Sequence, residues 1–265
     1  MATTGYAVVT GASSGIGAAI ARALAARGVP LILTARRLDR LEVLATELRD
    51  RVDVHVMPAD LAEAAAVAGL VDTIGHRGLQ VRMLVNNAGY GVPGRFDAVE
   101  WRRHADFLQV MVTAVCELTW RLLPSMRAFP DGRILNVASF AGLMPGSRGQ
   151  TLYGAAKAFM IRFSESLAQE HADHGLRVTA LCPGFTWSEF HDVTGTRAMM
   201  DRLPAWVWLD ADAVACAGLD ALDRGQVIAV PGWRYRLLHG ITRHLSDRQR
   251  LALMARNASK IRRVD

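Results

Sequence analysis

Short apolar runs alternate along the chain with stretches in which apolar residues recur at helical spacing. Runs of four to eight apolar residues predict buried strands, and a three-to-four-residue recurrence predicts amphipathic helices. The predicted strands are Tyr6–Thr10, Pro30–Ala35, Val52–Pro58, Met83–Asn86, Gly132–Ala138, Arg177–Cys182 and Gln226–Pro231. The predicted helices include Gly15–Arg27, Leu38–Asp50, Ala62–Gly75, Trp101–Ala128 and Thr151–His174. This alternation is typical of a parallel sheet covered on both faces, so we predict one doubly wound α/β domain of about seven strands.

Composition agrees with a globular domain. The chain has 265 residues, of which 51% are hydrophobic, which suffices for one domain with a full core. The first strand begins almost at once, so we expect no signal peptide, and no apolar run approaches the length that spans a bilayer. Cys116, Cys182 and Cys216 show no Cys-x-x-Cys spacing, and the eight histidines form no metal-ligand set. We therefore expect a cytoplasmic protein with reduced thiols and no metal.

The positive charge is concentrated at the C-terminus. The net charge is +6, and nine basic and two acidic residues between Trp233 and Asp265 give that segment +7, which leaves −1 for residues 1–232. A DNA-binding body is therefore not expected. We assign residues 1–232 to the domain and residues 233–265 to a basic tail. Apolar residues alternate with arginine there (Leu237, Leu238, Ile241, Leu245, Leu251, Leu253 and Met254), which fits a helix on an anionic membrane or a helix packed on another subunit.

The loop after the first predicted strand is rich in glycine and serine. Ligands of doubly wound sheets bind outside the carboxyl ends of the strands, so this loop is a candidate site. Glycine permits a tight turn and close backbone approach, and the following helix N-terminus offers free N–H groups to a pyrophosphate. The alternative is an ordinary strand-to-helix turn. We predict that Gly11, Ser13, Ser14, Gly15, Ile16 and Gly17 bind a dinucleotide.

The end of the second strand bears on the choice of cofactor. A fold of this kind that prefers NAD usually has an acidic residue here for the ribose 2′-hydroxyl, whereas this chain has Ala35 followed by Arg36 and Arg37. A guanidinium can fork onto a 2′-phosphate, so we predict NADP(H), with Arg36 as the phosphate ligand. We expect the other arginine, Arg37, only to solvate the start of the next helix. Asp60, followed by Leu61, could accept from the adenine amino group, cap the following helix, or do both.

The sequence contains only two lysines, Lys157 and Lys260, among 31 basic residues. Lys157 lies four residues after Tyr153, so on a helix the phenol and the ammonium share one face. Arginine cannot replace a compact ammonium whose pKa can shift. A cation beside Tyr153 would lower the phenol pKa from about 10, and a shift of three units needs roughly 4 kcal/mol. The alternative is that Tyr153 and Lys157 have this spacing by chance. This interpretation is less favoured because lysine is so rare in the chain.

Taken in order, these residues resemble the short-chain dehydrogenase/reductase family, in its single-domain, NADP(H)-preferring branch. The resemblance extends from Val8 to about Gly232. It includes Thr10-Gly-x-x-x-Gly-x-Gly17, Asp60, Asn86-Asn87-Ala88-Gly89, Ser139, Tyr153-x-x-x-Lys157 and Cys182-Pro183-Gly184. Each fragment alone is only suggestive, but each lies at a predicted strand end or on the expected helix. The resemblance implies a Rossmann fold.

The resemblance also implies roles for the site residues. Tyr153 would be the acid or base at the substrate oxygen, Lys157 would lower its pKa and bind the nicotinamide ribose, and Ser139 would orient the substrate oxygen. Both Tyr153 and Lys157 would thus contact the cofactor as well. The adenosine side would be lined by Asn87, Ala88 and Gly89, and the nicotinamide would be held by Pro183, Gly184 and Thr186. The cofactor would supply the hydride.

Three features depart from the family pattern. Met111 stands where similar members have an asparagine that helps to hold a water connecting Lys157 to solvent. Methionine is tolerated if a backbone carbonyl holds that water, and proton exchange is slow if the side chain does. Ser188 replaces a commoner threonine, next to bulky Trp187. The Ser139-to-Tyr153 interval is one residue longer than expected, which a loop insertion at residues 146–149 absorbs.

The expected substrate lid, at about residues 190–210, is apolar. It contains Phe190, Met199, Met200, Leu203, Trp206, Val207 and Trp208. Such a lid suits a bulky hydrophobic ketone, aldehyde or secondary alcohol, although the same residues fit core or interface packing equally well. The resemblance further implies a homodimer or homotetramer formed through the helices Trp101–Ala128 and Thr151–His174.

The sequence therefore predicts an NADPH-dependent carbonyl reductase, equally describable as an NADP-linked alcohol dehydrogenase. The reaction would be hydride transfer with Tyr153 as acid or base. The main alternative is a catalytically silent NADP(H)-binding sensor or scaffold, which Met111 favours and the retained Lys157 opposes. A sugar-nucleotide epimerase is not expected, because the chain is too short for a second substrate domain.

Overall fold

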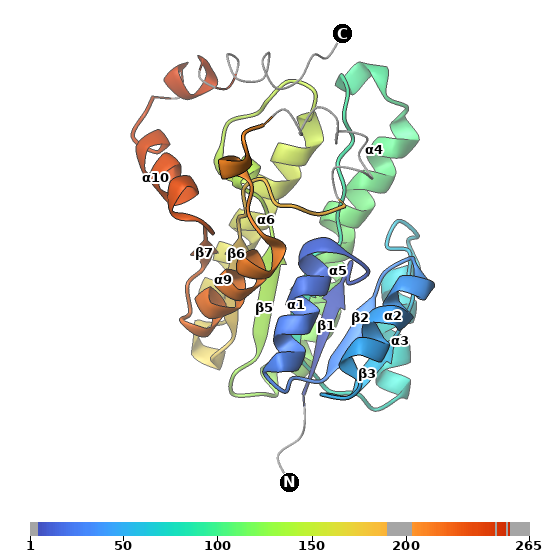
Figure 1. Ribbon diagram of the computed structural model, residues 1–265. Helices are drawn as coiled ribbons and strands as arrows, with labels where there is room; N and C mark the ends of the chain where they lie inside the picture. The colour runs from blue at the N-terminus through green and yellow to red at the C-terminus, as the bar shows by residue number, and fades with distance from the viewer. Residues whose placement is uncertain (1–4, 190–202, 247, 253, 255–265) are drawn as a thin grey trace.

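The seven strands form one parallel sheet in the order β3-β2-β1-β4-β5-β6-β7 (Figure 1). The computed structural model describes residues 5–189, 203–246, 248–252 and 254. The strands are β1 (Tyr6–Thr10), β2 (Leu31–Thr34), β3 (Val54–Val56), β4 (Val81–Asn86), β5 (Arg133–Val137), β6 (Arg177–Leu181) and β7 (Ile228–Ala229). Because the chain moves outward from β1 in one direction to β2 and β3 and in the other to β4, a crevice opens at the carboxyl ends of these strands. The predicted doubly wound α/β fold is confirmed.

Helices cover both faces of the sheet. The helices of the described part of the chain are α1 (Gly15–Ala26), α2 (Leu38–Leu48), α3 (Ala66–His76), α4 (Trp101–Leu108), α5 (Ala114–Arg127), α6 (Thr151–Glu170), α9 (Ala211–Asp223) and α10 (Trp233–Thr242). One core lies under α1, α2 and α9, and the other lies under α3, α5 and α6. No helix in the described part of the chain is long and apolar enough to cross a bilayer.

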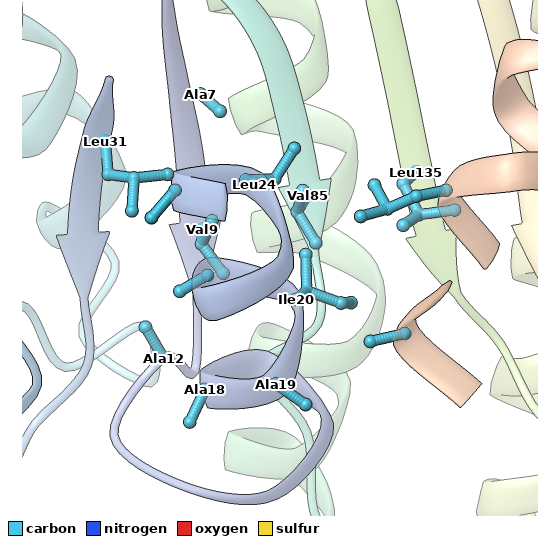
Figure 2. Close-up of a cluster of buried hydrophobic side chains, with 14 of the residues drawn as sticks. Ala7, Val9, Ala12, Ala18, Ala19, Ile20, Leu24, Leu31, Val85 and Leu135 are labelled. Carbon is cyan, nitrogen blue, oxygen red and sulfur yellow. The ribbon is translucent and has the colours of Figure 1, made fainter. Parts of the chain in front are cut away.

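The two cores explain the near-continuous apolar strands. Successive side chains of a strand point to opposite faces, so Val9 packs under α1 while Val8 packs under the helices of the other face. Figure 2 shows Ile20 and Leu24 of α1 beside Val9 and Val85 of the sheet. Ile20 is fully buried, and burying a side chain of this size contributes about 1.5–3 kcal/mol. These apolar contacts hold α1, and with it the loop that precedes the helix, against the centre of the sheet.

Several observed elements differ from their predicted bounds. The second and third strands are shorter than predicted, and each loses a proline, Pro30 or Pro58, which has no N–H to donate to a ladder. The predicted helix over 101–128 is divided by a π-helical turn, η2 (Gln109–Thr113), into α4 and α5. The predicted last strand keeps only Ile228 and Ala229, because β7 is an edge strand that pairs with β6 alone. These differences shift strand ends and divide one helix, and they leave the order of the elements unchanged.

Candidate active site

A cavity of about 1150 Å³ lies at the carboxyl ends of the strands. It is lined by the loops that follow β1, β2, β3, β4, β5 and β6 and by the first turns of α6. Of the residues predicted to bind cofactor or to act in catalysis, all line this cavity except Gly17. The structure therefore brings together residues between positions 11 and 186 that the sequence analysis assigned to one site.

Glycine is required at two positions of the loop between β1 and α1. Gly11 and Gly15 have φ angles of +64° and +54°, in the left-handed region that glycine occupies at low cost. Gly17 serves packing instead, because a Cβ there would lie 2.4 Å from Nδ2 of Asn87 and from the carbonyl oxygen of Gly11. The loop leads into the N-terminus of α1, whose first N–H groups have no partner within the helix. This arrangement fits the pyrophosphate of a dinucleotide.

Side chains after β1 and β4 hold the two central loops together. Asn87 Nδ2 donates to the carbonyl oxygens of Thr10 (2.8 Å) and Gly11 (3.2 Å). Thr10 Oγ1 accepts from the N–H groups of Asn87 (2.9 Å) and Ala88 (3.0 Å) and donates to the carbonyl oxygen of Val85 (3.1 Å). Asn87 thus braces the central strands, and its place beside the cavity agrees with the position predicted for it.

The two arginines after β2 differ in their surroundings. Arg36 is exposed and lines the cavity. Arg37 also lines the cavity and is held in place: its Nη2 donates to the hydroxyls of Ser13 (3.1 Å) and Ser14 (2.9 Å), and its Nη1 donates to Glu189 (3.0 Å). We expected one arginine only to solvate the next helix, and Arg37 instead contacts the glycine-rich loop. The sequence gives no sign of this contact, because Glu189 and Arg37 are 152 residues apart.

Asp60 follows β3 and lines the cavity next to Leu61. Its Oδ1 accepts from the N–H of Ala62 (3.1 Å). The carboxylate therefore caps a turn between β3, which ends at Val56, and α3, which begins at Ala66. One carboxylate oxygen takes part in this hydrogen bond, and Asp60 still faces the cavity.

Ser139 and Tyr153 reach the cavity from different elements. Ser139 follows β5 and starts the short helix η3 (Phe140–Leu143), and its Oγ accepts from the N–H of Ala141 (3.1 Å). Tyr153 lies in the first turn of α6, which begins directly after Gln150. The longer interval between them is taken up by the loop 144–150, whose Gly149 carbonyl accepts from the Gly94 N–H (3.2 Å). The predicted insertion therefore changes a loop and leaves both side chains at the cavity.

Lys157 is one turn further along α6 and is buried, with 4% of its surface exposed. Its Nζ donates to the carbonyl oxygen of Val137 at the end of β5 (2.7 Å) and lies 5.8 Å from the ring centroid of Tyr153. Burial lowers the pKa of Lys157 from 10.5 to about 8. Burial also raises the pKa of the neighbouring Cys182 thiol to about 12, so this thiol is neutral near pH 7. The phenol and the ammonium are neighbours at the cavity, as predicted.

The depressed pKa of Lys157 makes stability depend on pH. Between about pH 8 and pH 10.5 Lys157 has lost its proton in the folded protein and keeps it in the unfolded chain, so the contribution of Lys157 to the free energy of unfolding rises with pH in this window. Lys157→Met removes this contribution. We therefore expect the difference in unfolding free energy, variant minus wild type, to fall by on the order of 3 kcal/mol from pH 8 to pH 10.5. Urea denaturation at both pH values measures it, and a constant difference would contradict the buried ammonium.

Met111 lies in the π-helical turn η2 and is fully buried. Its side chain packs in an apolar cluster with Phe107 and Ala156, against which Tyr153 also packs. A Cβ on Gly89 would lie 2.8 Å from the Met111 sulfur, so glycine at this position makes room for the methionine. The side chain has no oxygen or nitrogen, so any water held at this place would depend on backbone carbonyls. Such π-turns often occur at functional sites because they interrupt regular backbone pairing.

The loop after β6 also lines the cavity. Thr186 is buried and donates to the carbonyl oxygen of Gly184 (3.1 Å). The ring of Tyr235 from α10 packs against Gly184 so closely that a Cβ there would lie 1.9 Å from it. The Tyr235 hydroxyl accepts from the Phe185 N–H (3.0 Å) and donates to the Val207 carbonyl oxygen (2.7 Å). Sequence reasoning missed Tyr235, because it lies in the segment assigned to the tail.

Part of the expected lid is also visible. Phe190, Met199 and Met200 lie outside the described residues. Trp206 and Val207 line the cavity, in the short helix η5 (Ala205–Val207). The other predicted lid residues within the described part, Leu203 and Trp208, do not line it. Trp208 stacks on Trp187 with ring centroids 4.1 Å apart. This part of the predicted lid therefore packs against the loop after β6.

Known proteins resemble this chain over most of its length. A family model described as short chain dehydrogenase matches residues 5–197. The sulfoacetaldehyde reductase of Chromohalobacter salexigens is 39% identical over 202 residues, which cover 74% of this chain and 78% of that protein. The bulky-bulky ketone specific alcohol dehydrogenase of Comamonas testosteroni is 30% identical with a TM-score of 0.75, covering 99% of this chain and 97% of that one. A short-chain dehydrogenase of Sphingobium yanoikuyae in complex with NADPH is 29% identical with a TM-score of 0.77, covering 92% and 99%.

Proposed function

The chain belongs to the short-chain dehydrogenase/reductase family, and we propose that it is an NADP(H)-dependent oxidoreductase that interconverts a hydrophobic ketone or aldehyde and the corresponding alcohol. Family membership makes it an oxidoreductase of carbonyl and alcohol groups that depends on NAD(H) or NADP(H). The observation that carries the finer proposal is the meeting of Ser139, Tyr153 and Lys157 with the glycine-rich loop in one cavity. The substrates named for these relatives differ, so the proposal names a chemical class.

Tyr153 would move the proton in this reaction. When bound, a nicotinamide cofactor supplies or accepts the hydride. Tyr153 donates its phenolic proton to the substrate oxygen during reduction and takes it back during oxidation. The buried ammonium of Lys157 would stabilise the phenolate. With a cofactor bound, Lys157 would also bind the nicotinamide ribose. Ser139, at the end of β5, orients the substrate oxygen and stabilises charge that develops there.

Most of the predicted site residues would hold the cofactor, Tyr153 and Lys157 among them. We assign the pyrophosphate to the loop from Gly11 to Gly17, the adenosine to the residues after β3 and β4, and the nicotinamide to the loop after β6. The residues are Gly11, Ser13, Ser14, Gly15, Ile16, Gly17, Arg36, Asp60, Leu61, Asn87, Ala88, Gly89, Tyr153, Lys157, Pro183, Gly184 and Thr186. All but Gly17 line the cavity, which supports this assignment.

A preference for NADPH over NADH would come from Arg36. The second strand ends without an acidic residue, and Arg36 is an exposed guanidinium at the cavity. A hydrogen bond to a charged group contributes about 1.5–3 kcal/mol, so Arg36→Ala should raise the KM for NADPH by about 30-fold and leave the KM for NADH within about twofold. Steady-state kinetics with both cofactors measure this change. Arg49→Ala at the far end of α2 serves as the control.

Two results would defeat the cofactor assignment. The first is tighter binding of NADH than of NADPH by the wild type in a fluorescence titration. The second is an equal loss for both cofactors in Arg36→Ala, which would indicate a structural role. Arg37→Ala measured in parallel separates phosphate binding from support of the loop, because Arg37 is held by Ser13 and Ser14.

A substrate panel tests the proposed activity. NADPH consumption is followed with hydrophobic ketones, aldehydes and, in the reverse direction with NADP⁺, secondary alcohols. The proposal expects turnover with bulky apolar members of the panel, because Trp206, Val207, Phe140 and Leu238 line the cavity. NADPH binding without turnover of any member would support the sensor or scaffold, which the apolar Met111 at its position favours.

We also propose a homodimer or homotetramer that pairs through α5 and α6. Trp120 on α5 and Phe159 on α6 are exposed, and aromatic residues are enriched at protein interfaces. We likewise propose a division into a domain (1–232) and a basic tail (233–265). The first helix of this tail takes part in the site, because Arg234, Tyr235 and Leu238 line the cavity. A cytoplasmic location is proposed from the isolated, unpaired cysteines among the described residues.

A further inference from the structure

One side of α10 exposes large apolar side chains. Trp233, Leu237 and Ile241 are 62%, 55% and 54% exposed, and they recur every four residues along the helix. Leu238 is exposed as well, whereas Thr242 is buried. Because positions three and four apart lie on one face of a helix, these side chains form one stripe. A contiguous stripe of this kind marks an interaction surface more often than scattered apolar residues do.

Arginines accompany this stripe. On a helix, Arg236 and Arg243 fall along one edge of it, and Arg234 lies between Ile241 and Leu238. The Arg234 guanidinium lies 5.6 Å from the Trp206 ring centroid and 5.0 Å from that of Trp233, and its Nη1 donates to the Trp206 carbonyl oxygen (3.0 Å). Trp206 is itself exposed, so it extends the surface. We define the α10 face as Trp206, Trp233, Leu237, Leu238 and Ile241 with Arg234, Arg236 and Arg243.

The charge of the α10 face restricts what can cover it. No aspartate or glutamate occurs between residues 232 and 246. A second copy docked by the same face would follow two-fold symmetry and bring its arginines together, with no carboxylate from residues 233–246 between them. An anionic bilayer satisfies both parts of the surface. Its headgroups pair with guanidiniums, its acyl boundary accepts leucine and isoleucine, and indole rings favour the region between.

We propose that the α10 face binds the surface of an anionic lipid bilayer. Trp206, Arg234 and Leu238 belong both to this face and to the lining of the active-site cavity. α10 follows β7 at the edge of the sheet (Figure 1). Tyr235 fixes the first turn of α10 against the loop after β6. Membrane contact therefore places one wall of the cavity at the lipid surface. Resting on the proposed function, this position gives apolar carbonyl substrates a route from the bilayer to Tyr153.

Vesicle co-sedimentation of the full chain tests the proposal. Vesicles of phosphatidylcholine with 30% phosphatidylglycerol are compared, at low salt, with vesicles of phosphatidylcholine alone. We expect the wild type to sediment with the anionic vesicles only. Arg236→Glu/Arg243→Glu should reduce the partition coefficient at least about tenfold, because each basic residue near the surface contributes to attraction. Leu237→Gln/Ile241→Gln should reduce it without a change of net charge.

A matched control separates local binding from net charge. Arg51→Glu/Arg77→Glu makes the same change in charge at two exposed positions near the amino ends of β3 and β4, away from the cavity. This variant should sediment like the wild type apart from a small general loss. An equal loss in both double variants, or equal binding to neutral vesicles, would overturn the proposal. A lower oligomeric state of the α10 variants in analytical ultracentrifugation would also overturn it, in favour of self-association.

Activity measured on the same proteins distinguishes the two proposals. With a water-soluble ketone, the α10 variants should retain wild-type turnover, because none of their changed residues lines the active-site cavity. Vesicle binding by a wild type that reduces no ketone would defeat the proposed function alone. Turnover by a wild type that does not sediment with anionic vesicles would defeat the membrane proposal alone.

Discussion

Tyr153→Phe should reduce kcat for ketone reduction by about 10³-fold. Phenylalanine keeps the ring in the first turn of α6 and removes only the hydroxyl that carries the proton. A positioned acid or base contributes typically 10²- to 10⁴-fold to a reaction of this kind. Stopped-flow or steady-state measurement of NADPH consumption with an active member of the ketone panel gives the ratio.

The matched measurement is NADPH binding by the same variant. The ring of Tyr153 packs against the apolar cluster that contains Met111, and phenylalanine preserves this contact. The variant should therefore fold and bind NADPH within about threefold of the wild type. Equal reduction rates for Tyr153→Phe and the wild type would remove Tyr153 from the chemistry and, with it, the proposed mechanism.

Lys157→Met should slow alcohol oxidation by at least about 100-fold at pH 7, measured at saturating NADP⁺. Without the ammonium, the phenol pKa returns toward its ordinary value of about 10, and less phenolate is present to accept the proton. The deficit should shrink as the pH rises. Above about pH 8 the wild type loses its own Lys157 charge, and toward pH 10 the phenol of the variant ionises unaided.

The shape of the pH profile separates this role from a structural one. A lysine that only supports the fold would leave a variant equally impaired at every pH. A deficit of the same size at pH 7 and pH 10 would therefore contradict the proposed effect on the phenol. Lys157 also has a structural contribution, because it donates a hydrogen bond to the Val137 carbonyl. The urea denaturation of Lys157→Met at pH 8 described above shows the effect of the substitution on stability separately from its effect on the rate.

Much of the fold follows from local sequence pattern. The strands are apolar on both faces because separate helices cover each face, so Val8 and Val9 are both buried. Glycines with positive φ, such as Gly11 and Gly15, coincide with the predicted dinucleotide loop. Strand ends were less predictable, since they depend on how far the neighbouring strand extends. The two-residue β7 illustrates this dependence.

Contacts between distant segments could not be predicted in the same way. Tyr235 reaches Gly184 and Phe185 across 50 residues, and nothing in its local sequence indicates that a tail residue forms a cavity wall. Arg37 bridges the glycine-rich loop and Glu189 through side-chain orientation that no periodicity encodes. The π-helical turn at Met111 was also missed, because apolar spacing there matches one continuous helix.

Ultraviolet difference spectroscopy of the NADP⁺ complex tests the acidic phenol most directly. Titrating the wild type minus Tyr153→Phe isolates the absorbance of one tyrosinate. We predict that this signal appears well below pH 10 in the wild type and moves up toward pH 10 in Lys157→Met. A wild-type phenol that ionises only near pH 10 with the cofactor bound would contradict the central role of the Tyr153–Lys157 pair.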